Sequence, residues 1–317
     1  MRWQDRYRVT GRLGVGPMGE VVGAVRGDGV PAEVAVKLLR RDLAARPGTG
    51  RLLRELVGRV HGVGGDHLVA VWDSFCDGEV AGLVMDLAEG QSLRGRLAVR
   101  GPLPPAGVAA TGARIAAALS DLHRRRFAHL AVKPENVLVD GERVRLTGHC
   151  VVPLLLAADG PDAVLLNSPQ YTAPEIPLRA PVGPPADLYA LGVVLYELCC
   201  GVPPLAGRGA TDLVHLLPSR PGGVPDALWS VIAALLARNP RRRPTAAETA
   251  HRLAAITDSL AGLPAGPRLP EPPQPVDARR GRIGGVLAAV AALGLLAPGP
   301  AAVQAAPPPP TGQAPSS

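Results

Sequence analysis

Two amino groups stand out among the basic side chains of this 317-residue sequence. Lysine and arginine together number 34, yet only Lys37 and Lys133 are lysine. A lysine ammonium is a compact charge on a flexible stem, whereas the arginine guanidinium is a planar fork that stays charged. Because the chain uses arginine for its other positive side chains, Lys37 and Lys133 are candidates for chemistry that requires an amine.

A glycine-rich loop precedes the first of these lysines. It reads Gly14-Val15-Gly16-Pro17-Met18-Gly19, and Lys37 ends the strand-like run Val34-Ala35-Val36-Lys37. Glu55 follows Lys37 by 18 residues, on a segment of helical periodicity. Glycine-rich loops occur in many settings, so the loop alone is a weak indication of phosphate binding. The lysine and glutamate that follow make it more specific.

The pattern of apolar residues divides the sequence into a strand-rich part and a helix-rich part. Short strands are predicted within residues 8–39, at 67–72 and at 80–85, with a helix at 52–60. The predicted helices after Gly90 cover residues 106–124, 187–200, 229–237 and 246–259. We therefore predict an α+β fold, with a small β-rich N-lobe (about 1–87) and a larger helical C-lobe (about 88–260).

The first part of this order resembles the N-lobe of protein kinases. In that family the glycine loop covers the phosphates of ATP, and the strand lysine pairs with a helix glutamate. Met85-Asp86-Leu87-Ala88 is similar to the hinge, which implies that backbone groups of Asp86 and Ala88 meet the adenine edge. The nucleotide-binding residues that the resemblance implies are Leu13, Gly14, Gly16, Gly19, Val21, Ala35, Lys37, Glu55, Met85, Asp86, Ala88, Asn136 and Leu138.

The resemblance continues through the helical part. His129-Leu130-Ala131-Val132-Lys133-Pro134-Glu135-Asn136 is similar to the catalytic loop, and its lysine is typical of serine/threonine kinases. The matches extend over about residues 5–258 and are closest in character to bacterial, actinobacterial-type serine/threonine kinases. The scaffold residues implied are His129, Glu175, Asp187 and Arg243.

Two positions depart from the family's chemistry. Ala131 stands where the catalytic-loop aspartate accepts the proton of the substrate hydroxyl, and a methyl group accepts no proton. Gly148-His149-Cys150 stands where the family has D-F-G, so the carboxylate that holds magnesium is replaced. His149 is expected to pack as a stand-in for the family's phenylalanine, since imidazole suits zinc or copper better than magnesium.

These departures predict a pseudokinase with no catalytic residue, although Lys133 is retained. ATP is the expected ligand, and magnesium, left with Asn136 as its only ligand, is expected to bind weakly or not at all. The partner is expected to be a signalling protein. One alternative is an active ATP-dependent serine/threonine kinase with an atypical base and metal ligands. Another is a structural module whose adenine slot is filled by Met85 and Leu87.

The end of the sequence predicts a tether. Residues 261–282 are rich in proline and arginine and are expected to form an extended linker beyond a domain that ends near residue 260. The uncharged segment 283–303 is predicted to be a transmembrane helix, with 304–317 a proline-rich disordered tail. The arginines before it would leave the kinase-like domain in the cytoplasm of the cell, attached to the cell membrane. A cytoplasmic chain without an anchor is the alternative.

Composition supports a folded protein in a reducing compartment. The four cysteines have no C-x-x-C spacing, and a chain of 317 residues can bury a core without disulfides. The formal net charge of +7 comes from scattered arginines with few aromatic residues between them, so no nucleic-acid partner is expected.

Overall fold

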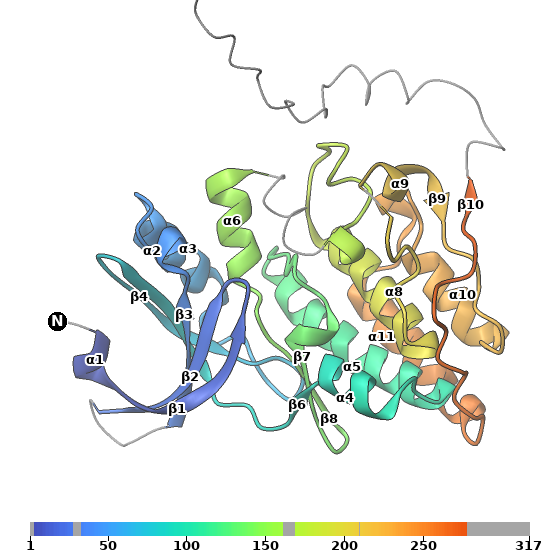
Figure 1. The fold of residues 1–317 in the computed structure, drawn as a ribbon, viewed down its shortest axis with the longest axis horizontal. Coiled ribbons are helices and arrows are strands. Elements are labelled where there is room, and N and C mark those ends of the chain that lie inside the picture. Colours follow the sequence, from blue (N-terminus) through green and yellow to red (C-terminus); the bar gives the residue numbers. More distant parts are fainter. Residues whose placement is uncertain (1–2, 28–32, 161–168, 209, 278–317) are drawn as a thin grey trace, which may run out of the picture. The chain divides into compact units, whose positions relative to one another are not determined.

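The structure is a computed structural model that describes residues 3–27, 33–160, 169–208 and 210–277 (Figure 1). Its elements follow the predicted order, with strands first and helices after them. One compact unit of the chain reaches from Met1 to Ala278.

The N-lobe is built on one antiparallel sheet of five strands. These are β1 (Tyr7–Gly16), β2 (Gly19–Arg26), β3 (Glu33–Leu39), β4 (Val71–Asp77) and β5 (Val80–Asp86), in the spatial order β1-β2-β3-β5-β4. The predicted strand at 67–72 therefore begins later, at Val71. A two-residue turn joins β1 to β2, and it requires glycine at Gly19. That residue has φ 129°, and a Cβ atom there would lie 1.9 Å from the carbonyl oxygen of Leu38.

Helices cover both faces of the sheet in the N-lobe. The short α1 (Trp3–Arg6) lies on the outer face, where Trp3 stacks on Phe75 with ring centroids 5.2 Å apart. The inner side is packed against α3 (Thr49–Val60), which follows α2 (Arg41–Ala44). Successive side chains along the strands point to opposite faces of the sheet and thus pack into two apolar cores. The inner core is continuous with the core of the C-lobe.

The C-lobe surrounds a central buried helix, α8 (Pro184–Cys200), whose residues from Ala186 to Cys200 are all buried. A small sheet of β6 (Gln91–Ser92), β7 (Val137–Asp140) and β8 (Arg143–Leu146) borders the N-lobe. The other elements are α4 (Leu93–Arg100), α5 (Pro105–Arg124), η1 (Pro134–Asn136), α6 (Val151–Asp159), η2 (Pro169–Tyr171), α9 (Ala210–His215), β9 (Leu216–Leu217), α10 (Asp226–Leu235), η3 (Pro240–Arg242), α11 (Ala246–Thr257), η4 (Asp258–Leu260) and β10 (Val276–Asp277).

The predicted linker differs from what the structure shows. Residues 263–277, here called the C-terminal strap, lie along the C-lobe and end as β10 beside β9 (Figure 1). The Leu269 N–H donates to the Cys200 carbonyl at 2.9 Å, and the Ser219 hydroxyl donates to the Gln274 carbonyl at 2.6 Å. Prolines cannot donate a backbone hydrogen bond, but the residues between them can. The compact unit therefore extends past the predicted domain end near residue 260, to Ala278.

Among the described residues, none of the helices has the length and apolar character needed to cross a bilayer. The predicted transmembrane segment 283–303 and the tail 304–317 lie outside the described residues.

Removing the C-terminal strap is expected to destabilise the domain. A chain ending at Gly262 loses the β9–β10 pairing and the bonds to Cys200 and Ser219, each worth about 1 kcal/mol. We expect a lower melting temperature and a lower urea midpoint than for a chain ending at Ala278. Replacing the exposed Glu271 by alanine in the longer chain is the control and should change neither value. Equal stability of the two chain lengths would show that the strap contributes nothing to folding.

Candidate nucleotide site

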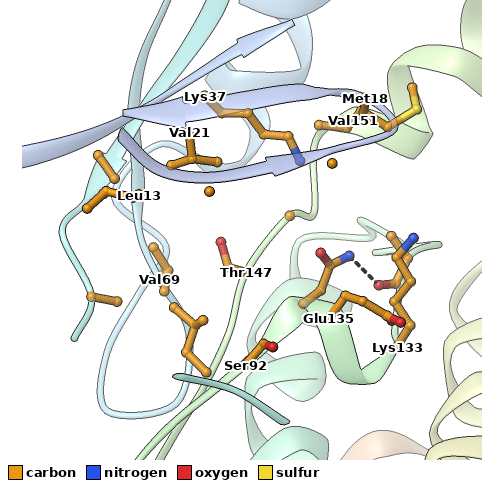
Figure 2. A pocket seen from close by; sticks show the side chains of 18 of the residues that line it. Leu13, Met18, Val21, Lys37, Val69, Ser92, Lys133, Glu135, Thr147 and Val151 are labelled. Carbon is orange, nitrogen blue, oxygen red and sulfur yellow. Dashed lines mark hydrogen bonds between the residues drawn. The ribbon is translucent and has the colours of Figure 1, made fainter. Parts of the chain in front are cut away.

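A cavity of about 930 Å³ lies under the β1–β2 hairpin, between β3 and the sheet of the C-lobe (Figure 2). It brings together most of the residues that the sequence predicted for a nucleotide site. Those that line it are Leu13, Gly14, Gly16, Gly19, Val21, Ala35, Lys37, Met85, Asp86, Ala88, Asn136 and Leu138. Ala131 and Lys133 line it as well, whereas Glu55 does not.

One end of the cavity is apolar and is suited to a flat ring. Val21 of β2 and Leu138 of β7 come from opposite lobes, and Met85 is buried at the end of β5. The carboxylate of Asp86 is already engaged, accepting from the Trp72 indole N–H at 2.7 Å and facing the Arg145 guanidinium at 3.4 Å. The hinge therefore offers its backbone to a ligand, while the Asp86 side chain holds the hinge in place.

Lys37 extends from β3 into the other end, where Figure 2 shows its amino group on the side of Met18 and Val151. Among the described residues, no carboxylate pairs with it. Burial, and to a smaller extent the positive charge of Lys133, lower the pKa of Lys37 to about 8. The buried amine therefore has no counter-charge of its own among the described residues, which favours an anionic ligand.

The predicted pairing of Lys37 with Glu55 is wrong for this structure. Glu55 is exposed on α3 and lies 4.0 Å from Arg51, one turn before it. The buried stripe of α3 consists of Leu53, Leu56, Val57 and Val60, and the helical period places position 55 on the opposite face.

The helix α6 forms part of the cavity wall and was not predicted from the sequence. The helix begins directly after Cys150, packs against α3, and buries its first five residues. Val151 and Val152 line the cavity beside Lys37, where they present methyl groups. An ion pair between Arg46 and Asp159 holds its far end. The run Val151-Val152-Pro153-Leu154-Leu155-Leu156 was the available signal, since proline is tolerated in a first helical turn.

The catalytic-loop backbone is held by one buried carboxylate. Asp187, on α8, accepts from the backbone N–H groups of His129 and Leu130 at 2.8 and 2.7 Å, and from His123 at 2.8 Å. Leu130 takes φ 57°, a strained conformation for a residue with a side chain, and these bonds stabilise it. The His129 ring in turn accepts from the Ala131 N–H at 3.1 Å. The loop therefore keeps a fixed conformation around Ala131.

The two positions without aspartate adjoin the same end of the cavity. Asn136 donates its amide to the Ala131 carbonyl at 2.8 Å. Gly148 has φ 89°, and a Cβ atom there would lie 3.0 Å from the Asn136 amide nitrogen. The acidic residues that line the cavity within the described part of the chain are Asp86 and Glu135, and no group of three or more potential metal ligands occurs there.

Glu135 lines the cavity and also belongs to a network of hydrogen bonds below it. Arg94 of α4 donates to Glu135 at 2.8 Å and to the buried Glu197 at 2.5 Å. The Tyr171 hydroxyl donates to Glu197 at 2.6 Å and accepts from Arg94 at 2.5 Å. Burial and then the neighbouring Glu197 raise the pKa of Tyr171, so this hydroxyl stays protonated. The network ties α4, η1, η2 and α8 together, and sequence reasoning did not identify Arg94 or Glu197.

The other two predicted scaffold residues, Glu175 and Arg243, contact each other in the C-lobe. Arg243 and Glu175 form a buried two-pronged ion pair with distances of 2.6 and 2.7 Å, and the guanidinium lies over the Tyr189 ring. The pair joins the segment after η2 to the chain after η3.

His149 is packed in the interior between the rings of Phe127 and His129. Neither of its ring nitrogens has a hydrogen-bond partner in the part of the chain that the structure describes, and burial lowers its pKa to about 4. This agrees with the predicted stand-in for phenylalanine.

A five-stranded lobe and a helical lobe with a cavity between them are typical of two-lobed proteins with a nucleotide cleft. Residues 7–253 match the model of the protein kinase domain family, and the chain belongs to that family. It is 36% identical over 293 residues to the serine/threonine-protein kinase PkaB of Streptomyces coelicolor, covering 86% of this chain and 68% of PkaB.

Other relatives extend the comparison. PknL of Mycobacterium tuberculosis is also 36% identical, over 61% of this chain and 51% of PknL, and PkaA of Streptomyces coelicolor is matched over 45% of its length. The chain thus spans about half the length of these two kinases. The crystal structure of the Mycobacterium tuberculosis PknI kinase domain superposes with a TM-score of 0.65 at 26% identity, covering 81% of this chain and 96% of that one.

Replacing His149 by phenylalanine is expected to stabilise the protein and to weaken its acid sensitivity. An unfolded histidine binds a proton near pH 6.5, whereas folded His149 does so only near pH 4. The unfolded state thus binds more protons between these values, so the free energy of unfolding falls as pH drops from 6.5 to 4, by about 3 kcal/mol for this group. The variant should lose that slope, as measured by urea unfolding at pH 7, 5.5 and 4.5.

At pH 7 the same variant removes two unpaired buried nitrogens, which favours a gain of about 1 kcal/mol. His251, exposed on α11, provides the control, and His251→Gln should change neither stability nor slope. An unchanged pH slope in His149→Phe would contradict the buried, neutral imidazole.

Proposed function

We propose that this chain is a catalytically impaired protein kinase domain that holds an adenine nucleotide without magnesium and acts through contacts with a protein partner. The observation that carries this proposal is the pairing of an open cavity with Ala131 and Gly148 at the two positions where kinases use aspartate. The cavity supports binding of a nucleotide, and the missing carboxylates argue against transfer of its phosphoryl group.

The expected effect of losing the general base and the metal ligand supports impaired phosphoryl transfer. A positioned general base contributes about 10²–10⁴-fold to rate, and none is available from the methyl group of Ala131. A metal clamp on the transferring phosphoryl group contributes several kcal/mol more. Asn136 alone is a poor site for magnesium, because it offers one amide oxygen to an ion that prefers octahedral coordination by oxygen. The two losses together would reduce transfer to a level near or below detection.

Nucleotide binding is favoured over a purely structural role. The structural alternative requires Met85 and Leu87 to fill the adenine slot, whereas both residues line a cavity of about 930 Å³. At the opposite end Lys37 and Lys133 supply two ammonium groups that can bind phosphate oxygens in place of a metal.

An active kinase with an atypical base is the alternative. It would need a carboxylate beside Lys133 and Asn136, and Glu135 is the described acidic residue nearest to them in the chain. Its carboxylate, however, accepts a charged hydrogen bond from Arg94 at 2.8 Å. This engagement argues against Glu135 as a base.

Attachment to the cell membrane through residues 283–303 stays a prediction of the sequence, and so does a protein partner in signalling. Fractionation of cells that express the full chain, compared with a chain ending at Ala278, tests the anchor. Loss of the membrane fraction in the shorter chain is the expected result.

Thermal shift with ATP is the first test of the proposal. A ligand that binds only the folded state raises stability by RT ln(1 + [L]/Kd), so ATP at 100 times Kd adds about 2.7 kcal/mol. We expect the same shift with magnesium and with EDTA, and no phosphate transfer to a generic protein acceptor. Lys37→Met should remove most of the shift.

Arg143→Met is the matched control, since Arg143 is an exposed cation outside the cavity, and it should keep the full shift. Absence of any shift in the wild-type protein would leave the structural alternative. Magnesium-dependent phosphate transfer would refute the proposal and establish the active-kinase alternative.

Nucleotide affinity is expected to fall as pH rises from 7 to 9. The ammonium form of Lys37 binds the anion, and it loses its proton near pH 8. Loss of one charged hydrogen bond costs about 10-fold in affinity. Titration with a fluorescent ATP analogue should show an inflection near pH 8, and Lys37→Arg should bind without this inflection because its guanidinium stays charged. A pH-independent wild-type affinity would exclude Lys37 from the anion site.

A further inference from the structure

The C-terminal strap turns every third residue toward the C-lobe. Between Pro264 and Pro275 the partly buried residues are Gly266, Leu269, Pro272, Pro273 and Pro275, and all of them except Pro273 are three positions apart. A polyproline II chain has three residues per turn, so one of its three edges meets a surface at this spacing. The backbone of residues 263–277, which the structure describes throughout, has no positive φ and forms no helix. The strap therefore follows the C-lobe in an extended, polyproline-like form.

A second edge of the strap carries prolines that face water. Pro264, Pro267 and Pro270 are three positions apart, and each of them is exposed. The chain bends at Pro270 and Glu271, and the next proline of this edge, Pro273, is partly buried. The three exposed prolines that precede or begin the bend, Pro264, Pro267 and Pro270, are here called the proline ridge.

Contacts on both sides of the bend hold the strap on the C-lobe. The Leu269 N–H donates to the Cys200 carbonyl at 2.9 Å, and the Arg268 guanidinium donates to the Leu97 carbonyl. Beyond the bend, β10 pairs with β9. Proline also fixes its own φ, so the ridge has little conformational freedom left to lose. A partner that binds the ridge therefore avoids much of the ordering cost that a free peptide would impose.

The chemistry of the ridge specifies what can bind it. Proline rings present apolar surface and no backbone N–H, so a partner cannot pair with them as a β-strand. Proline-rich segments in this extended form bind in grooves lined by aromatic side chains. A second copy of this chain is a poor partner, because of its three Trp, four Tyr and two Phe, all in the described part of the chain, only Trp72 is exposed.

We propose that the proline ridge is a docking site for a different protein, one whose binding groove is lined by aromatic rings. This inference gives a chemical class to the protein partner of the proposed function, and it rests on that part of the proposed function alone. The residues of the ridge do not line the nucleotide cavity. Nucleotide binding and partner binding can therefore be tested separately.

The test uses the full chain and two probes that read polyproline segments, a purified WW domain and a purified SH3 domain. Each fluorescently labelled domain is titrated with the chain, and binding is followed by anisotropy. We expect saturable binding of at least one domain. The double variant Pro267→Ala with Pro270→Ala should weaken it about 10-fold, because two apolar rings leave the contact.

Two controls locate the binding on the ridge. Glu271→Ala changes an exposed residue of the strap outside the ridge and should bind like the wild type. The sequence has a second run of prolines at residues 307–310, and replacing these four by alanine should also leave binding unchanged. The ridge prolines are exposed, so the double variant should keep the circular dichroism spectrum of the wild type.

The possible outcomes separate this inference from nucleotide binding. Loss of domain binding in the double variant, with the ATP thermal shift intact, would support the inference. Absence of binding to both domains in the wild type would overturn it and leave nucleotide binding standing. Full binding by the double variant would overturn it as well, since the contact would then lie elsewhere. Domain binding without an ATP shift would support the inference and refute nucleotide binding.

Discussion

The buried carboxylate of Asp187 is the interaction on which the geometry of the site depends. It lies on a helix with no exposed face between Ala186 and Cys200, and it binds two successive backbone N–H groups of the catalytic loop. Because Leu130, which carries the second of these N–H groups, has φ 57°, the loop would relax without these two hydrogen bonds. A buried charge that lost these partners would be costly, so the carboxylate and the loop conformation stabilise each other. This constraint operates whether or not residue 131 is an acid.

The residues that hold the C-lobe together are therefore different from the residues at the two positions where the family has aspartate. Glu175 with Arg243, and Arg94 with Glu197, hold the C-lobe through contacts that lie outside the cavity wall or below it. Ala131 and Gly148, in contrast, adjoin the cavity and make no side-chain hydrogen bond. An alanine and a glycine at these two positions bury no unpaired polar group, so the scaffold contacts do not depend on a side chain there.

Sequence patterns located the lobes, the hinge and the catalytic loop, and twelve of the thirteen residues predicted for the nucleotide site line the cavity. Spacing between motifs fixes the order of the chain, and each motif carries its own backbone geometry. The helix α6 was not predicted, and three further features were also missed. The orientation of Glu55 depends on which face of α3 packs, which motif spacing does not determine. The C-terminal strap was predicted to be a linker beyond the domain, because proline content indicates an extended chain but not the surface along which that chain lies. Arg94 was missed because its partners, Glu135 and Glu197, are distant in sequence and meet only in the fold.

The geometry around Gly148 bears on whether aspartates at positions 131 and 148 alone would form a magnesium site. An aspartate there would need a left-handed backbone and would place its Cβ against the Asn136 amide, which is already bonded to the catalytic loop. Val151 and Val152 begin an apolar helix only a few residues later, beside a lysine whose expected glutamate is turned to solvent. Magnesium would need oxygen ligands where methyl groups now line the wall. Aspartates introduced at positions 131 and 148 would add carboxylates to the cavity, but they would leave the helix α6 in place and Glu55 turned to solvent.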